Sequence, residues 1–211
     1  IVMKTKIIVF FLFATTAVAF GQPLSFPEGT PGHVRQVFER FLPIAYYCSG
    51  QYAIPASMIL AIAALETGYG TADSPLVQLC YNYFSIKGGA CPDCCKKVIE
   101  YQNERGERVR VKLDACFLRF ERPEDSFLAF CGLITEQHRY RNLRSIARWD
   151  YRRWANRLKA AGYATDPDYA RKLIRIVERY ALYRYDPLPA PHPYWPEGIP
   201  FVQKNPLPDR R

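Results

Sequence analysis

The sequence predicts an α+β protein that is mainly helical. Apolar residues recur at helical spacing over most of the chain, whereas in residues 97–120 they alternate with polar residues as in a β-hairpin. Of the 211 residues, 49% are hydrophobic and 15% are aromatic, which is enough for a sizeable core. The part that follows a predicted leader, roughly 190 residues, has the length of one domain.

Residues 1–19 have the pattern of a signal peptide. Lys4 and Lys6 form a basic start, residues 7–13 are apolar, and an A-x-A pattern of the cleavage-site type ends the segment. The apolar stretch is too short for a stable membrane anchor. We therefore expect export to the periplasm, the cell wall or the outside of the cell, with no membrane anchor once the signal is removed.

The formal charge of +9 is compatible with a polyanionic partner such as nucleic acid, a membrane surface or the cell wall. The basic residues are dispersed through predicted helices and follow no nucleic-acid-binding motif, so we do not expect a nucleic-acid partner. They include Arg139, Arg141, Arg144, Arg148, Arg152, Arg153 and Arg157. The same pattern is also typical of a solvated helix face.

The first predicted helix covers residues 34–47. Its apolar residues recur at helical spacing, and Pro43 is expected to kink or restart the helix. Residues 48–53 are expected to link it to the next helix.

The central helix is predicted in residues 54–70, IPASMILAIAALETGYG. Pro55 fits a first turn, every residue from 56 to 65 except Ser57 is apolar, and Gly68 fits the position after the last turn. Such a helix is expected to be buried on most sides.

Glu66 extends an apolar stripe of this helix that includes Ile59, Ile62 and Ala63. Burial and the negative end of the helix dipole both favour the protonated carboxyl, which is the form that a general acid needs. The alternative is a residue at the rim whose carboxylate reaches water or a basic side chain.

Aromatic residues gather around residues 82–88. Tyr81 and Phe84 can stack on the face of a sugar ring, and Asn82 can form hydrogen bonds with hydroxyl or acetamido groups. The alternative is that Phe84 belongs to the core and that Asn82 caps a turn.

Seven cysteines follow the leader, and in an exported chain they favour disulfides over a zinc site. The adjacent Cys94 and Cys95 fit a tetrahedral metal site poorly. We expect a disulfide between Cys91 and Cys116 at the base of the hairpin, with at least one of the seven left without an intramolecular partner.

The chain after Pro123 is predicted to be helical. Three apolar stripes are expected to face the core, and the last helix is expected to begin with Asp166 as N-cap and Pro167 at its first position. Residues 187–211 are rich in proline and are expected to form an extended tail.

Six segments of the chain resemble, in order, the glucosaminidase family of bacterial peptidoglycan hydrolases, glycoside hydrolase family 73. They are IPASMILAIAALETGYG, NYFSIKG, CFLRFERPEDSF, HRY, AGYATDPDYARKL and YALYRYD. The resemblance extends over residues 32–186. It implies a lysozyme-like helical domain with a β-hairpin lobe over the active-site cleft, and it makes Glu66 the catalytic acid.

The resemblance also suggests a second carboxylate on the hairpin. The segment IEY resembles the family's T-x-E-Y run and places this role on Glu100, although Val98 stands where the family has threonine. Glu104 and Asp114 remain alternatives, and Glu100 could equally be an exposed strand residue.

Further site residues follow from the same resemblance. The tyrosine of GYATDP, Tyr163, is expected to face the active site; the rival interpretation is a buried tyrosine bonded to a backbone carbonyl. The family's asparagine–aromatic motif borders the cleft, so Asn82 and Tyr81 are expected to bind substrate. Phe84 is also assigned to the substrate site, on the side that faces the core.

The resemblance thus implies an endo-β-N-acetylglucosaminidase that hydrolyses β-1,4 bonds of peptidoglycan. The second step would use Glu100 or the substrate's own acetamido group. We expect a monomer that binds peptidoglycan glycan strands, with no metal and no organic cofactor. The alternatives are a muramidase or lytic transglycosylase on the same scaffold and a non-catalytic wall-binding protein.

Overall fold

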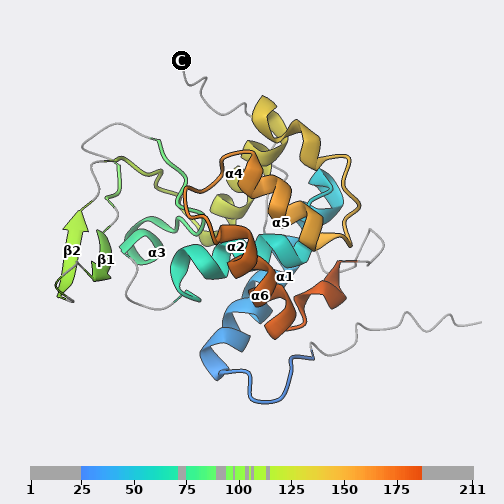
Figure 1. The fold of residues 1–211 in the computed structure, drawn as a ribbon, viewed down its shortest axis with the longest axis horizontal. Helices are drawn as coiled ribbons and strands as arrows, with labels where there is room; N and C mark the ends of the chain where they lie inside the picture. Colours follow the sequence, from blue (N-terminus) through green and yellow to red (C-terminus); the bar gives the residue numbers. More distant parts are fainter. Residues whose placement is uncertain are drawn as a thin grey trace, which may run out of the picture.

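The computed structural model describes residues 25–70, 75–88, 94–96, 98–102, 105, 107–112 and 115–186. The predicted signal peptide and the proline-rich tail lie outside the described residues. The described helices are α1 (Gly32–Tyr52), α2 (Ala56–Thr67), α3 (Pro75–Cys80), α4 (Pro123–Glu136), α5 (Tyr151–Ala160) and α6 (Tyr169–Arg179), with the short 3-10 helices η1 (His138–Leu143) and η2 (Leu182–Tyr185). Strands β1 (Val98–Gln102) and β2 (Arg108–Lys112) form a two-stranded sheet beside the helices (Figure 1).

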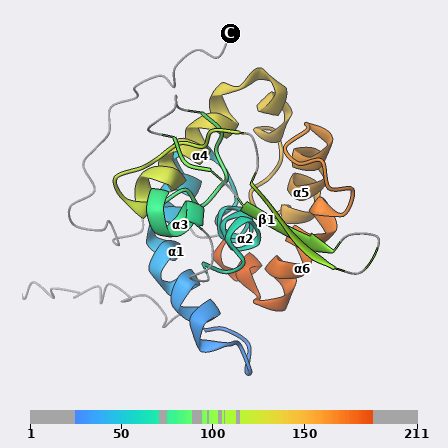
Figure 2. The same cartoon turned by 90° about the vertical axis from the view of Figure 1, so that its left-hand side faces the viewer.

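Helix α2 lies at the centre of the fold, as the sequence predicts. Every side chain from residue 56 to residue 64 is buried. The helix packs against α1, α5, α6 and η2, and Figure 2 looks along it with the other helices around it. It ends at Gly68, whose φ of 58° is left-handed and therefore favours glycine. Among the helices of the described residues, none combines the length and the apolar character needed to cross a membrane.

Helix α1 differs from the prediction, because it continues through Pro43 to Tyr52 without a restart. A proline inside a helix removes one backbone donor, but the buried residues Phe41, Ile44, Ala45 and Cys48 keep the helical spacing on both sides of it. Their burial against α2 and α4 maintains one helix. The prediction that residues 48–53 form a link was therefore wrong for residues 48–52, which are helical, and Ala53 alone lies beyond the helix.

The start of α2 is joined to the end of the described chain by a buried hydrogen-bonded pair. Asp186 accepts hydrogen bonds from the Ser57 backbone N–H at 2.8 Å and from the Ser57 hydroxyl at 2.6 Å. Asp186 is 2% exposed, and burial raises its pKa from 3.8 to about 6. Asp186 thus caps the start of α2, the helix that carries Glu66, although it lies 129 positions from Ser57 in the sequence.

Aromatic rings join α1, α4 and the segment that follows α3. Phe41 of α1 stacks on Phe127 of α4 at 4.7 Å between ring centroids. Phe84 stacks on Phe130 at 4.3 Å and meets the Phe127 ring edge-on at 4.8 Å. This aromatic layer fixes the segment around Asn82 against α4.

Two disulfides lie around the base of the sheet, and they differ from the predicted pairing. Cys80 bonds Cys95, and Cys94 bonds Cys116. The prediction of a Cys91–Cys116 bond was wrong, because Cys94 takes Cys116; Cys91 lies outside the described residues. The backbone explains the outcome: Cys95 and Phe117 exchange two hydrogen bonds of 3.0 Å, which bring Cys94 within reach of Cys116 at a Cα–Cα distance of 5.2 Å.

The last long helix begins later than predicted. Asp168 is the N-cap residue of α6, and Asp166 instead closes a turn before it by accepting a hydrogen bond from the Asp168 N–H at 2.9 Å. An Asp side chain can bond the backbone two residues on, and this local bond competes with the N-cap role.

Candidate active site

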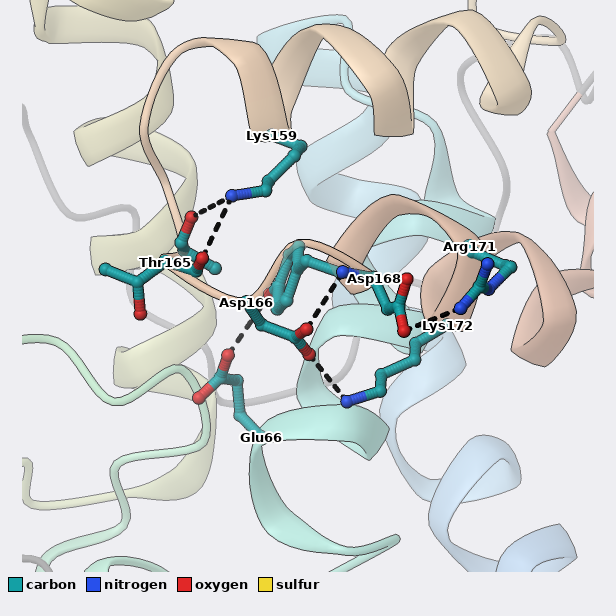
Figure 3. A network of polar contacts seen from close by, with 9 residues as sticks. Glu66, Lys159, Thr165, Asp166, Asp168, Arg171 and Lys172 are labelled. Carbon is teal, nitrogen blue, oxygen red and sulfur yellow. Dashed lines mark hydrogen bonds and ion pairs between the residues drawn. The ribbon is translucent and has the colours of Figure 1, made fainter.

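Glu66 lies in the last turn of α2 and is half-buried. Its Oε1 atom accepts a hydrogen bond of 3.1 Å from the hydroxyl of Tyr169, the first residue of α6. Figure 3 shows the Glu66 carboxyl directed toward the segment that joins α5 to α6. Helices α2 and α6 therefore meet at this carboxyl group, although Glu66 and Tyr169 are 103 residues apart in the sequence.

The turn after Glu66 is held by several short bonds. The Thr67 hydroxyl donates to the Ala63 carbonyl at 2.7 Å and accepts from the Gly70 N–H at 2.8 Å. Gly70 has a φ of 66°, and a Cβ atom there would lie 3.0 Å from a methyl group of Val37. The positive φ and the close approach of Val37 both favour glycine at position 70, so few other residues would allow the backbone conformation that follows Glu66.

Two tyrosines line the region around the Glu66 carboxyl. The rings of Tyr163 and Tyr169 lie 5.7 Å apart, and the Tyr163 hydroxyl donates to the Phe84 carbonyl at 3.4 Å. Burial and then the charge of Glu66 raise the pKa of Tyr163 well above its ordinary value. Burial raises the pKa of Tyr169 as well, with further contributions from Tyr163 and Glu66. Both hydroxyls therefore stay protonated and available as donors.

Tyr163 thus combines features of both interpretations of the sequence. It bonds a backbone carbonyl, and it lies close enough to Glu66 for the carboxylate charge to affect its pKa. Tyr169 lies on the last of the three apolar stripes that were expected to face the core, and the sequence did not predict its contact with Glu66. The available signal was its hydroxyl, since a buried tyrosine hydroxyl needs a hydrogen-bond partner.

Basic side chains hold the segment between α5 and α6 on which Tyr163 lies (Figure 3). Lys159 donates to the carbonyls of Ala164 and Thr165 at 2.9 and 3.2 Å. Lys172 pairs with Asp166 at 2.6 Å, and this bond is the largest of the causes that lower the pKa of Asp166. These contacts join both flanking helices to the segment and limit its movement relative to Glu66.

The segment around Asn82 supplies one exposed aromatic residue. Asn82 is 1% exposed; its amide nitrogen donates to the Ile86 and Leu118 carbonyls, and its amide oxygen accepts from the Ile86 N–H. These bonds hold the segment in place and leave the amide closed to solvent. Phe84 is buried, as expected for the side of the core, whereas Tyr81 is 39% exposed. Of these three residues, Tyr81 is the one open to a sugar ring.

The hairpin carries the proposed second carboxylate. Glu100 lies in β1 and is paired in register with Arg110 of β2. Glu104 and Asp114 lie outside the described residues. In the part of the chain that is described, no group of three or more His, Cys, Asp or Glu side chains could hold a metal ion.

A half-buried carboxyl group with a hydroxyl donor beside it, on a mainly helical fold with a small sheet, fits the class of glycoside hydrolases. The chain belongs to the glucosaminidase family. The family model described as mannosyl-glycoprotein endo-beta-N-acetylglucosaminidase matches residues 42–182.

Known proteins of similar sequence and structure agree with this assignment. Peptidoglycan hydrolase FlgJ of Escherichia coli strain K12 is 30% identical over 162 residues, which make up 74% of this chain and 50% of FlgJ. Exo-glucosaminidase LytG of Bacillus subtilis strain 168 is 28% identical over 163 residues, 76% of this chain and 52% of LytG. The chain thus spans about half the length of these relatives.

A solved structure shares the fold. The C-terminally truncated glycoside hydrolase domain of Salmonella typhimurium FlgJ superposes with a TM-score of 0.51 at 30% identity, covering 69% of this chain and 96% of that domain. This similarity confirms the mainly helical fold that the sequence predicts.

Tyr169→Phe tests whether the Tyr169 hydroxyl positions Glu66. For a catalytic Glu66, we expect kcat to fall about 10-fold with KM nearly unchanged, because the lost bond orients this carboxyl and does not contribute to substrate binding. Tyr151→Phe is a matched control, since Tyr151 donates a 3.2 Å bond to Glu178 on an exposed surface. Equal kcat values for the two variants would contradict a positioning role.

Proposed function

We propose that this chain is an exported endo-β-N-acetylglucosaminidase that hydrolyses β-1,4 glycosidic bonds of bacterial peptidoglycan, with Glu66 as the general acid. The observation that carries the proposal is the Glu66 carboxyl at the end of buried α2, bonded by Tyr169, in a chain of the glucosaminidase family. Relatives named as a peptidoglycan hydrolase and an exo-glucosaminidase support the wall glycan as substrate. The predicted signal peptide supports export.

In the first step, the Glu66 carboxyl donates a proton to the oxygen of the leaving sugar as the glycosidic bond breaks. Positive charge then develops on the other sugar in an oxocarbenium-like transition state. The Tyr163 hydroxyl lies in the electrostatic range of Glu66 and helps to position or stabilise this centre. Tyr169 holds the Glu66 carboxyl in one orientation. Exposed Tyr81 offers a ring for stacking on substrate.

The hairpin is the natural source of a second carboxylate. Figure 1 draws β1 and β2 on the side of the molecule where α3 lies, and Figure 2, seen from that side, draws them starting beside the end-on view of α2 and extending past it on the side of α5 and α6. This arrangement supports a hairpin lobe over the active-site cleft, with Glu100 as base or nucleophile in the second step. The substrate's own acetamido oxygen is the alternative nucleophile.

The products of digestion test the proposal directly. Purified peptidoglycan is digested with the protein lacking its leader, and the released muropeptides are analysed by mass spectrometry, with Glu66→Gln as the control. We expect fragments of several disaccharides with N-acetylglucosamine at the reducing end. N-acetylmuramic acid at the reducing end would indicate a muramidase. Products without a reducing end would indicate a lytic transglycosylase, and the release of single sugars would indicate an exo-acting enzyme. No products from a folded protein would favour the wall-binding alternative.

Glu100→Gln tests the second carboxylate. We expect kcat on wall fragments to fall by about 100-fold with little change in KM, because this group acts in the transition state. Glu104→Gln and Asp114→Asn serve as matched variants, because these residues are the alternatives from the sequence, and they should stay near the wild-type rate. If one of these two variants loses its activity while Glu100→Gln stays active, the assignment of Glu100 as the second carboxylate is wrong. If all three stay active, the acetamido route explains the second step.

A further inference from the structure

Two cysteines outside the disulfides described above lie together in the core. Cys48 is on α1 and Cys131 is on α4, and both are fully buried. The Cys48 Sγ atom lies 3.9 Å from the Phe127 carbonyl, one helical turn before Cys131 on α4. Both are free thiols in the structure, and Cys48 is, after burial, a cause of the raised pKa of the Cys131 thiol, which agrees with neighbouring thiols across the α1–α4 contact.

The surroundings of the two thiols agree with this placement. Tyr47 and Tyr52 of α1 both have a raised pKa, for which burial is the first cause and Cys48 and Cys131 are the next two. Both thiols therefore lie near the same pair of tyrosine hydroxyls. The two tyrosines are half-buried, whereas both cysteines are fully buried.

We propose that Cys48 and Cys131 form a third disulfide, which joins α1 to α4. The two thiols lose two protons and two electrons in thiol–disulfide exchange with an oxidant of the protein-disulfide class, whose disulfide becomes two thiols. The same chemistry accounts for Cys80–Cys95 and Cys94–Cys116, so the conditions that form these bonds also suit this pair.

Burial determines when this bond can form. The thiolate is the reacting species, and burial raises the pKa of the Cys131 thiol, so the pair reacts slowly once the core has closed. The bond therefore forms while the chain is still folding. A protein that folds without oxidant keeps the pair as unreactive thiols. The thiol form and the disulfide form of the protein therefore interconvert slowly under native conditions.

The position of the bond relates it to the candidate active site. Helix α4 carries Phe130, which stacks on Phe84 at 4.3 Å and meets the Tyr163 ring edge-on at 6.0 Å. A covalent link between α1 and α4 restricts the movement of these two helices, both of which contribute rings to this aromatic layer. It also encloses α2 and the hairpin in a long loop of the unfolded chain, which is where a disulfide stabilises most in the chain-entropy description.

Peptide mapping of the full chain decides the proposal without any measurement of activity. The protein is folded in a glutathione redox buffer, unfolded in the presence of an alkylating reagent, digested and analysed by mass spectrometry without reduction. We expect the Cys48 peptide to be linked to the Cys131 peptide. Alkylated Cys48 and Cys131 beside intact Cys80–Cys95 and Cys94–Cys116 links would overturn the proposal, and so would a link from either residue to Cys91.

A second measurement tests the stabilising effect. We expect the oxidised protein to melt about 10 °C above the double variant Cys48→Ala/Cys131→Ala. When both proteins are folded without oxidant, the difference should shrink to the smaller effect of removing two buried thiols. A difference that is the same with and without oxidant would show that packing, and not a covalent bond, links the two helices.

Discussion

Glu66→Gln is expected to lower the hydrolysis of purified peptidoglycan by about 1,000-fold, because it removes the proton donor from the bond-breaking step. The glutamine keeps an oxygen that can accept the 3.1 Å bond from the Tyr169 hydroxyl, so the position of the side chain should be preserved. The loss should therefore appear in kcat. Turbidity of a peptidoglycan suspension measures it, together with release of reducing ends.

The control for this variant is Glu178→Gln. Glu178 also accepts a hydrogen bond from a tyrosine, Tyr151, but on an exposed surface of α6. We expect its activity to stay near that of the wild type, and both variants should melt within a few degrees of it. Substantial hydrolysis by a folded Glu66→Gln protein would rule out Glu66 as the general acid.

Asp186→Asn is expected to remove a pH dependence of stability that arises at the start of α2. The pKa of Asp186 is about 6 in the folded protein against 3.8 as its ordinary value, so the folded state holds this proton more tightly than the unfolded state does. The resulting stabilisation is fully present below about pH 3.8 and is lost as the pH rises through about 6. A shift of this size corresponds to about 3 kcal/mol.

The asparagine cannot ionise, but its amide oxygen can still accept the bond from the Ser57 N–H. We therefore expect Asp186→Asn to equal the wild type in free energy of unfolding at pH 4 and to exceed it by about 2–3 kcal/mol at pH 7.5. Urea unfolding at a series of pH values measures the difference. A variant less stable than the wild type at pH 7.5 would mean that Ser57 and the nearby Arg148, which both lower the pKa of Asp186, outweigh its burial.

Asp166→Asn provides a comparison with the opposite sign. The bond with Lys172 is the main cause that lowers the pKa of Asp166, so its contribution is present above the ordinary pKa of 3.8 and is lost as the pH falls. Asp166 is an exposed partner in this ion pair, so the effect should be small. A pH trend in the same direction for both variants would indicate a general charge effect and not the buried carboxyl of Asp186.

The sequence by itself determined the elements whose signals are local. Helix α2 could be predicted because nearly every residue between Pro55 and Gly68 is apolar, and such a segment is stable only when it is surrounded by other elements. The candidate acid was singled out by the resemblance to the glucosaminidase family, because a carboxyl group that extends an apolar stripe could equally lie at the rim of the helix. The buried residues of α4, including Phe127, Phe130 and Cys131, likewise follow from helical spacing.

The tertiary structure alone decided which partners these elements bring together. Tyr169 meets Glu66 across 103 residues, and Asp186 meets Ser57 across 129. Neither contact leaves a periodic pattern, because a hydrogen bond between distant residues depends on how the helices pack and not on the spacing within either one. Cys116 takes Cys94 as its partner for a related reason, since backbone pairing of Cys95 with Phe117 places them together. Likewise, α1 runs through Pro43 because burial on both sides of the proline outweighs the one backbone hydrogen bond that it removes.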